Sequence, residues 1–213
     1  AAALVLALTG AQAHADHDTA KAQAHGHAHA HDHAPQKTVA KGYFEDAQIA
    51  PRSLSDWQGA WQSVYPLLLD GKLDAVMAHK AEHGDKTAAE YAAYYKTGYA
   101  TDVGGIVIDG DRVTFQRADK AVSARYAADG YEILTYAKGN RGVRFIFKKT
   151  EGDAEAPGFI QFSDHKIAPE AADHYHLYWG DDRAGLLKEL TNWPTYYPAA
   201  LSPHEVADEM MAH

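Results

Sequence analysis

Short runs of apolar residues, separated by Gly, Asp, Asn and Pro, follow one another along the second half of the chain. Apolar residues that alternate with polar ones between turn residues are typical of strands with one buried face. The clearest hairpin signal is Asp109-Gly110, because this dipeptide favours the tight turns that join antiparallel strands. We therefore expect seven strands, at residues 105–108, 112–116, 121–126, 130–136, 143–148, 158–162 and 174–179.

Residues 53–100 predict mainly helices. Trp57 and Trp61 are spaced i, i+4, which would place both rings on one face of a helix. Two further helices are expected over residues 73–83 and 87–95, and the second of these begins with the spacing of a capping box.

The end of the chain is also expected to be helical. Ser202 supplies a cap, Pro203 the first helical position and Glu205 the third. Seven antiparallel strands with flanking helices predict a mainly β fold of the α+β type, as a barrel or a sandwich.

The N-terminal part of the chain differs in composition from the rest. Residues 1–10 are small and apolar, but the run is shorter than the about 20 residues that span a bilayer. With the small residues that follow, residues 1–15 are expected to be the remnant of a secretory signal, which predicts a periplasmic protein. Residues 16–42 are a low-complexity, histidine-rich tail, expected to be disordered without metal, and residues 43–213 form the folded domain.

Composition and charge narrow the functions that this domain can have. At 46% hydrophobic residues the chain can bury a core, and its formal net charge of −9 disfavours nucleic acid as a partner. The chain has no cysteine, so a metal site must use histidines and carboxylates. We expect a monomer that does not insert into a membrane.

Three histidines at the end of the β-rich region form the principal candidate site. His174 and His176 lie two residues apart in a predicted strand, so both side chains point to the same face, and Tyr175 points to the other. His165 follows the preceding strand and can reach the same point if the two strands pair. Three neutral imidazoles favour Zn²⁺ and leave a fourth position open.

The remaining histidines are weaker candidates. The tail histidines are expected to bind Zn²⁺, Ni²⁺ or Cu²⁺ weakly, because ordering a flexible chain around a metal costs free energy. His79 and His83 are spaced i, i+4 and could form a pair, although a solvated helix end explains them as well. The principal tail residues are His25, His27, His29, His31 and His33.

The domain contains several long, uninterrupted segments of specific sequence, at residues 54–68, 71–74, 98–102, 129–136, 159–165, 167–169, 192–198 and 209–213. These segments resemble the ZinT (YodA) family of periplasmic zinc proteins. The resemblance implies a lipocalin-like (calycin) antiparallel β-barrel, with zinc held by His165, His174 and His176 at the barrel mouth. It also implies zinc capture under scarcity, acceptance of Cd²⁺, and transfer to a ZnuA-like binding protein of a zinc ABC importer.

Two other functions are compatible with the residues. A three-histidine zinc site with an open position could serve a hydrolase or hydratase, but Asp164 and Asp173, the nearest acids in sequence, are expected to point away. A lipocalin-type carrier of an apolar ligand is the second alternative, and it would require an apolar cavity inside the barrel. The expectation is therefore a binding protein rather than an enzyme.

Overall fold

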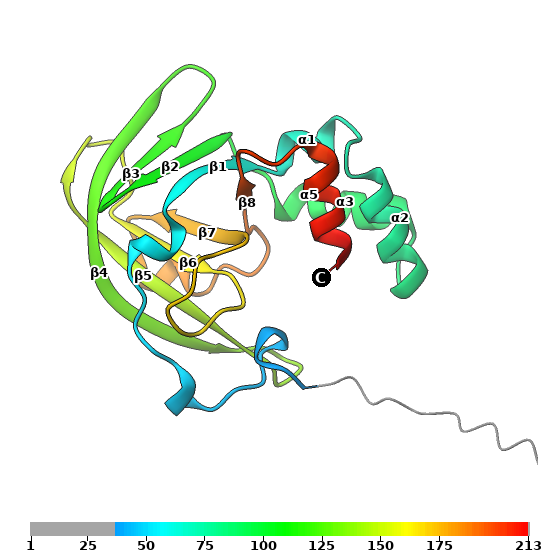
Figure 1. Cartoon of the computed structure of the whole chain (residues 1–213), viewed down its shortest axis with the longest axis horizontal. Coiled ribbons are helices and arrows are strands. Elements are labelled where there is room, and N and C mark those ends of the chain that lie inside the picture. The colour runs from blue at the N-terminus through cyan, green and yellow to red at the C-terminus, as the bar shows by residue number, and fades with distance from the viewer. Residues whose placement is uncertain (1–36, 213) are drawn as a thin grey trace, which may run out of the picture. The chain divides into compact units, whose positions relative to one another are not determined.

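A computed structural model describes residues 37–212 of the chain. Its centre is a closed barrel in which each strand pairs antiparallel with its neighbour in sequence, and β8 pairs back with β1 (Figure 1). The strands are β1 (Gly59–Ser63), β2 (Gly105–Asp109), β3 (Arg112–Gln116), β4 (Ala121–Thr135), β5 (Arg141–Gly152), β6 (Phe159–Ser163), β7 (Tyr175–Gly180) and β8 (Thr195–Pro198).

This architecture confirms the predicted fold class. The β2–β3 hairpin turns at Asp109-Gly110 as expected, with Asp109 paired to Arg112 and Gly110 at a φ of 61°. Closing the barrel removes the free edges that an open sheet would leave.

The expected strand list was wrong in two respects. The segments 121–126 and 130–136 form one long strand, β4, because the predicted turn at Asp129-Gly130 is a β-bulge opposite β5. The strands β1 and β8 were not expected at all. In addition, His174 lies just before β7 rather than within it.

Trp57 and Trp61 do not share a helix. Trp57 ends a short 3-10 helix, the chain turns at Gly59, and Trp61 lies in β1. The indole Nε1 of Trp61 donates a hydrogen bond of 2.8 Å to the carbonyl oxygen of Trp57. Both rings are buried, so the i, i+4 spacing correctly predicted a shared environment but the wrong element.

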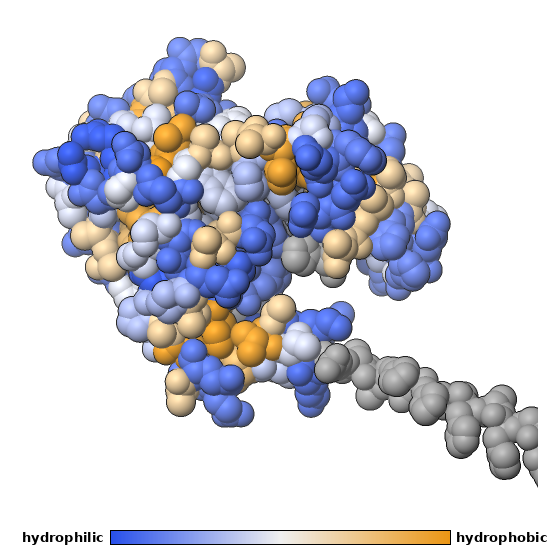
Figure 2. Space-filling view, in the orientation of Figure 1, coloured by the Kyte–Doolittle hydropathy of each residue, from blue (hydrophilic) through white to orange (hydrophobic). Residues whose placement is uncertain are grey.

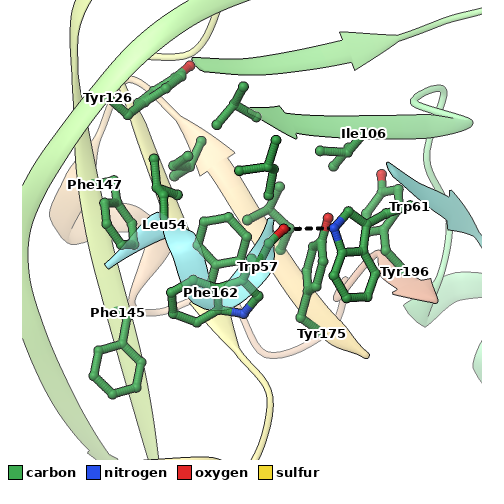
Figure 3. Close-up of a cluster of buried hydrophobic side chains, with 14 of the residues drawn as sticks. Leu54, Trp57, Trp61, Ile106, Tyr126, Phe145, Phe147, Phe162, Tyr175 and Tyr196 are labelled. Atoms are coloured by element: carbon green, nitrogen blue, oxygen red, sulfur yellow. Dashed lines mark hydrogen bonds between the residues drawn. The ribbon is translucent and has the colours of Figure 1, made fainter. Parts of the chain in front are cut away.

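Aromatic side chains fill the interior of the barrel (Figure 3). Trp57 is fully buried, stacks on Phe162 with ring centroids 4.4 Å apart, and meets Phe147 edge to face. Tyr175 packs against Trp61 in the same cluster. These rings occupy the space that a lipocalin-type carrier would give to an apolar ligand.

Most of the helices form a layer beside the barrel (Figure 1). Helix α2 packs against α3 and α5, and a second hydrophobic cluster that includes Leu73, Val76 and Val206 holds this layer together. The capping box expected at Thr87 and Glu90 is present. The α-helices are α1 (Tyr65–Leu69), α2 (Asp74–His83), α3 (Ala88–Gly98), α4 (Arg183–Leu186) and α5 (Pro203–Ala212), and the 3-10 helices are Val39–Lys41, Asp46–Gln48 and Leu54–Trp57.

In Figure 2, hydrophilic residues predominate at the end of the helical layer furthest from the barrel. Within residues 37–212, no helix combines the length and the apolar character needed to cross a membrane.

Candidate metal centre

The structure brings His165, His174 and His176 together at one rim of the barrel. His165 follows β6, while His174 precedes β7 and His176 lies in it, opposite Ser163 of β6. The ring centroids are 5.7 Å apart for His165 and His174, 5.9 Å for His165 and His176, and 6.0 Å for His174 and His176. One nitrogen of each ring lies within 4.8 Å of the others, so small side-chain rotations bring all three onto one ion.

The alternation along β7 separates this cluster from the barrel core. Tyr175 and Leu177 are fully buried members of the core cluster, and His176 lies between them on the other face of the strand. His174 is 8% exposed and His165 is exposed, so the cluster opens toward solvent on the His165 side.

His165 has an unusual backbone. Its φ of 66° lies in the left-handed region, and it is the one non-glycine residue with positive φ among residues 37–212. Such a conformation in a non-glycine residue costs about 1–2 kcal/mol and persists only where the surrounding structure imposes it.

A buried ion pair holds the loop that carries His165. Arg52 Nη1 donates to Asp164 Oδ1 over 2.6 Å, and both side chains are fully shielded from solvent. The same guanidinium donates to Asp56 and to the carbonyl oxygen of Glu170, while the backbone N–H of Lys166 donates to Asp164. The residues on both sides of His165 are therefore fixed from the interior.

The hydrogen bonds around Thr195 select the tautomer of His176. The Thr195 hydroxyl donates to the carbonyl oxygen of Trp193 over 2.9 Å, and its oxygen lies 2.7 Å from His176 Nδ1. A hydroxyl has one proton to donate, so its oxygen accepts from a protonated Nδ1. This leaves the lone pair of Nε2 available for a metal. Thr195 is thus the kind of outer hydrogen-bond partner that metal-binding histidines commonly have.

The electrostatic surroundings keep this ring neutral. Burial, and then the neighbouring His174, His165 and Arg144, hold the pKa of His176 well below its ordinary range. The ring of His174 is oriented by stacking on Tyr197, with centroids 5.0 Å apart and planes within 9°. Neutral, oriented imidazoles are the form in which histidine binds metals.

The acids adjacent in sequence are engaged elsewhere. Asp164 is paired with Arg52, and Asp173 is paired with Lys166 Nζ over 2.9 Å. Sequence reasoning found the three histidines but missed Arg52 and Thr195. The aromatic run after Thr195 was the one signal for β8, since Tyr residues favour strands.

The other candidate histidines are placed as follows. His79 and His83 lie on α2 with ring centroids 4.8 Å apart, close to Glu82. His204 lies in the first turn of α5, 3.5 Å from Asp208. The tail residues His25, His27, His29, His31 and His33 are outside the described residues, as is His213.

Comparison with known proteins identifies the family. The family described as "ZinT (YodA) periplasmic lipocalin-like zinc-recruitment" matches residues 35–213. The chain belongs to the ZinT (YodA) family.

ZinT-like relatives are named for metal binding. The chain is 58% identical over 176 residues to a probable metal-binding protein, YrpE, of Bacillus subtilis, covering 82% of this chain and 70% of YrpE. It is 54% identical over 182 residues to the zinc-binding protein AdcA of Streptococcus pyogenes serotype M1, covering 83% of this chain but 35% of AdcA. These names describe binding proteins rather than catalysts.

The ZinT-like fold also has solved counterparts. The structure of the Zn(II)-bound ZinT-like domain of Streptococcus pneumoniae AdcA superimposes with a TM-score of 0.80 at 49% identity, covering 83% of this chain and 99% of that domain. Zn(II)-bound AdcA itself gives the same TM-score at 50% identity, with this chain covering 39% of it. The chain therefore spans less than half of AdcA.

Proposed function

We propose that this protein captures Zn²⁺ through His165, His174 and His176, outside the cytoplasm, and passes it to another zinc-binding protein. The observation that carries the proposal is the convergence of three imidazole nitrogens within 4.8 Å, with the Nε2 lone pair of His176 directed by Thr195. The relatives named as zinc-binding proteins support zinc as the ion.

The capture site is tested by replacing its histidines singly with Gln in a chain whose seven histidines in residues 1–42 are also changed to Gln. Each replacement should lower Zn²⁺ affinity by more than the roughly 10–100-fold typical of losing an outer partner, because a ligand itself is lost. His204→Gln is the matched control, since His204 is exposed on α5. Affinity measured by chelator competition that is unchanged in all three variants would contradict the assignment.

Transfer follows from the open coordination position. Three imidazoles leave one of four zinc positions free, and His165 is exposed, so an incoming ligand can bind before the others release. The organisation of AdcA supports a role beside another zinc-binding unit, because in AdcA a ZinT-like domain is one part of a longer zinc-binding protein. Stopped-flow transfer to a ZnuA-like protein should exceed spontaneous release and rise with acceptor concentration. Transfer at the release rate, independent of the acceptor, would indicate a zinc buffer.

The tail histidines would act as a local collector. His25 to His33 alternate with small residues and are tethered to the domain, so zinc held there is concentrated near the capture site. Replacing the seven histidines of residues 1–42 with Gln should lower the number of weakly bound Zn²⁺ ions and retain the tight one. Isothermal titration calorimetry separates the weakly bound ions from the tight one. Loss of the tight ion would show that the principal site lies in the tail. Cd²⁺, Ni²⁺ and Cu²⁺ should compete with Zn²⁺ at the tail histidines and at the capture site.

A further inference from the structure

A second group of metal-ligating side chains lies on α2, in the helical layer rather than at the barrel rim. His79, Glu82 and His83 are spaced i, i+3 and i+4, so the helix places all three on one face. One ligand atom of each lies within 4.8 Å of the others, the same convergence that the barrel histidines have. Two histidines in this spacing with a glutamate before the second occur on the metal-binding helices of some zinc peptidases.

The position within the helix favours a cation. The three residues form the last turn of α2, which ends at His83. The carbonyl groups at a helix C-terminus carry partial negative charge, so a divalent ion bound there interacts favourably with the helix. A hollow of about 280 Å³ between this turn and the end of α5 includes His79 and His83 in its lining and gives room for an ion with its water.

The neighbouring cations have partners of their own, although Lys80 also lines the hollow. Lys80 Nζ lies over the ring of Tyr95, 5.4 Å from its centroid, and Lys86 pairs with Asp85 over 3.0 Å. Glu82 therefore offers a negative charge to an incoming ion, beside two imidazoles.

We propose that His79, Glu82 and His83 form a second Zn²⁺ site, separate from the barrel site. Two imidazoles and one carboxylate are a ligand set known for zinc, with the fourth position left to water. The site should bind more weakly and exchange faster than the three barrel histidines, because Glu82 and His83 are exposed and must be ordered on binding. The inference goes beyond the proposed capture site and does not depend on it.

The test uses the chain with the seven histidines of residues 1–42 changed to Gln. Calorimetric titration with Zn²⁺ should show a tight event and a weaker one. His79→Gln and His83→Gln should each abolish the weaker event, and Glu82→Gln should weaken it about tenfold. His204→Gln is the control, because His204 is also exposed on a helix with a carboxylate at i+4, but within residues 37–212 no third potential ligand joins this pair. A weaker event that persists in both histidine variants, or that is lost in His204→Gln, overturns the proposal.

A site-resolved measurement separates the two sites. Imidazole ¹⁵N resonances of His79 and His83 should shift together beyond the first equivalent of Zn²⁺. When His165, His174 and His176 are all changed to Gln, the same resonances should shift from the first additions of Zn²⁺. Failure of the barrel assignment would leave this result intact. Shifts at neither His79 nor His83 up to several equivalents of Zn²⁺ would exclude the second site.

Discussion

His165 combines a proposed ligand position with a left-handed backbone, at a φ of 66°. The about 1–2 kcal/mol that this conformation costs is offset by the interior contacts of Asp164 and Lys166 on either side. The ring is thus held near its partners before a metal arrives. A ligand set that is already ordered loses less conformational entropy on binding, so strain at this one residue favours affinity.

Thr195 should influence zinc binding without contacting the metal. Changing Thr195→Val keeps the shape of the side chain but removes the oxygen that accepts from His176 Nδ1. We expect Zn²⁺ affinity to fall by roughly 10–100-fold in chelator competition. Thr195→Ser retains the hydroxyl, so its Zn²⁺ affinity should be close to that of the wild type. Equal affinities in the Val and Ser variants would show that the hydroxyl does not set the tautomer.

The pKa of His176 predicts a pH-dependent stability of the metal-free protein. In the unfolded chain this imidazole takes up a proton near pH 6.5, whereas in the folded protein its pKa is held well below that value. The unfolded state therefore binds more protons below about pH 6.5, and stability falls as the pH is lowered through this window. The Tm of the metal-free protein, followed between pH 8 and pH 5, should drop less in His176→Gln than in wild type. Parallel curves would contradict the prediction.

At the scale of elements, the site depends on how the β6–β7 connection is attached to the barrel. Arg52, from the segment before β1, spans Asp56, Asp164 and the carbonyl oxygen of Glu170, and stacks over the ring of Trp57 at 4.1 Å. One guanidinium therefore connects the site loop to the aromatic core.

Removing that guanidinium should be strongly destabilising. Arg52→Met leaves the carboxylate of Asp164 buried without its partner, which typically costs about 3–5 kcal/mol of unfolding free energy. Urea denaturation followed by tryptophan fluorescence measures this loss. Arg125→Met removes an arginine from exposed pairs with Asp111 and Glu151 and should change stability little. Equal denaturation midpoints for the two variants would show that the buried Arg52 pair contributes no more to the free energy of unfolding than the exposed Arg125 pairs do.

The same elements show what the sequence could and could not predict. Period-two alternation located six of the strands, because this pattern is local, and it placed His176 opposite Tyr175 and Leu177, although His174 lies just before β7. β8 is only four residues long, too short for a periodicity to show. In β1, the spacing of Trp57 and Trp61 fitted a helix as well as a chain that turns at Gly59.

The partners of the site could not be predicted because they are distant in sequence. Asp164 lies 112 residues from Arg52, and Thr195 lies 19 residues from His176 on a strand that was not expected. Such contacts exist only after the barrel closes. The family resemblance supplied the ligand set as a whole, but it did not identify these supporting side chains.

At the scale of the whole folded unit, the candidate centre contacts the hydrophobic clusters, through His174 on Tyr197, but neither cluster is built around it. The barrel cluster and the helical cluster are built from apolar side chains, and the three histidines belong to neither. The second metal site proposed on α2 also lies outside both clusters. Metal binding and folding are therefore coupled only through the affinity of the folded state for the ion.

Zinc should accordingly stabilise this protein without being required for its fold. An ion that binds only the folded state at a free concentration 100 times its Kd adds about 2.7 kcal/mol. In a chain of this length each kcal/mol raises the Tm by about 2–4 °C, so a rise of about 5–10 °C is expected by calorimetry. Metal-free protein should keep the near-ultraviolet circular dichroism of its packed aromatic rings, because Trp57, Phe162 and Tyr175 pack without the ion. The chain with His165, His174 and His176 all changed to Gln is the control, and it should show the same spectrum with a much smaller rise in Tm. A metal-free protein without that spectrum would instead fold only around its ion, as a zinc finger does.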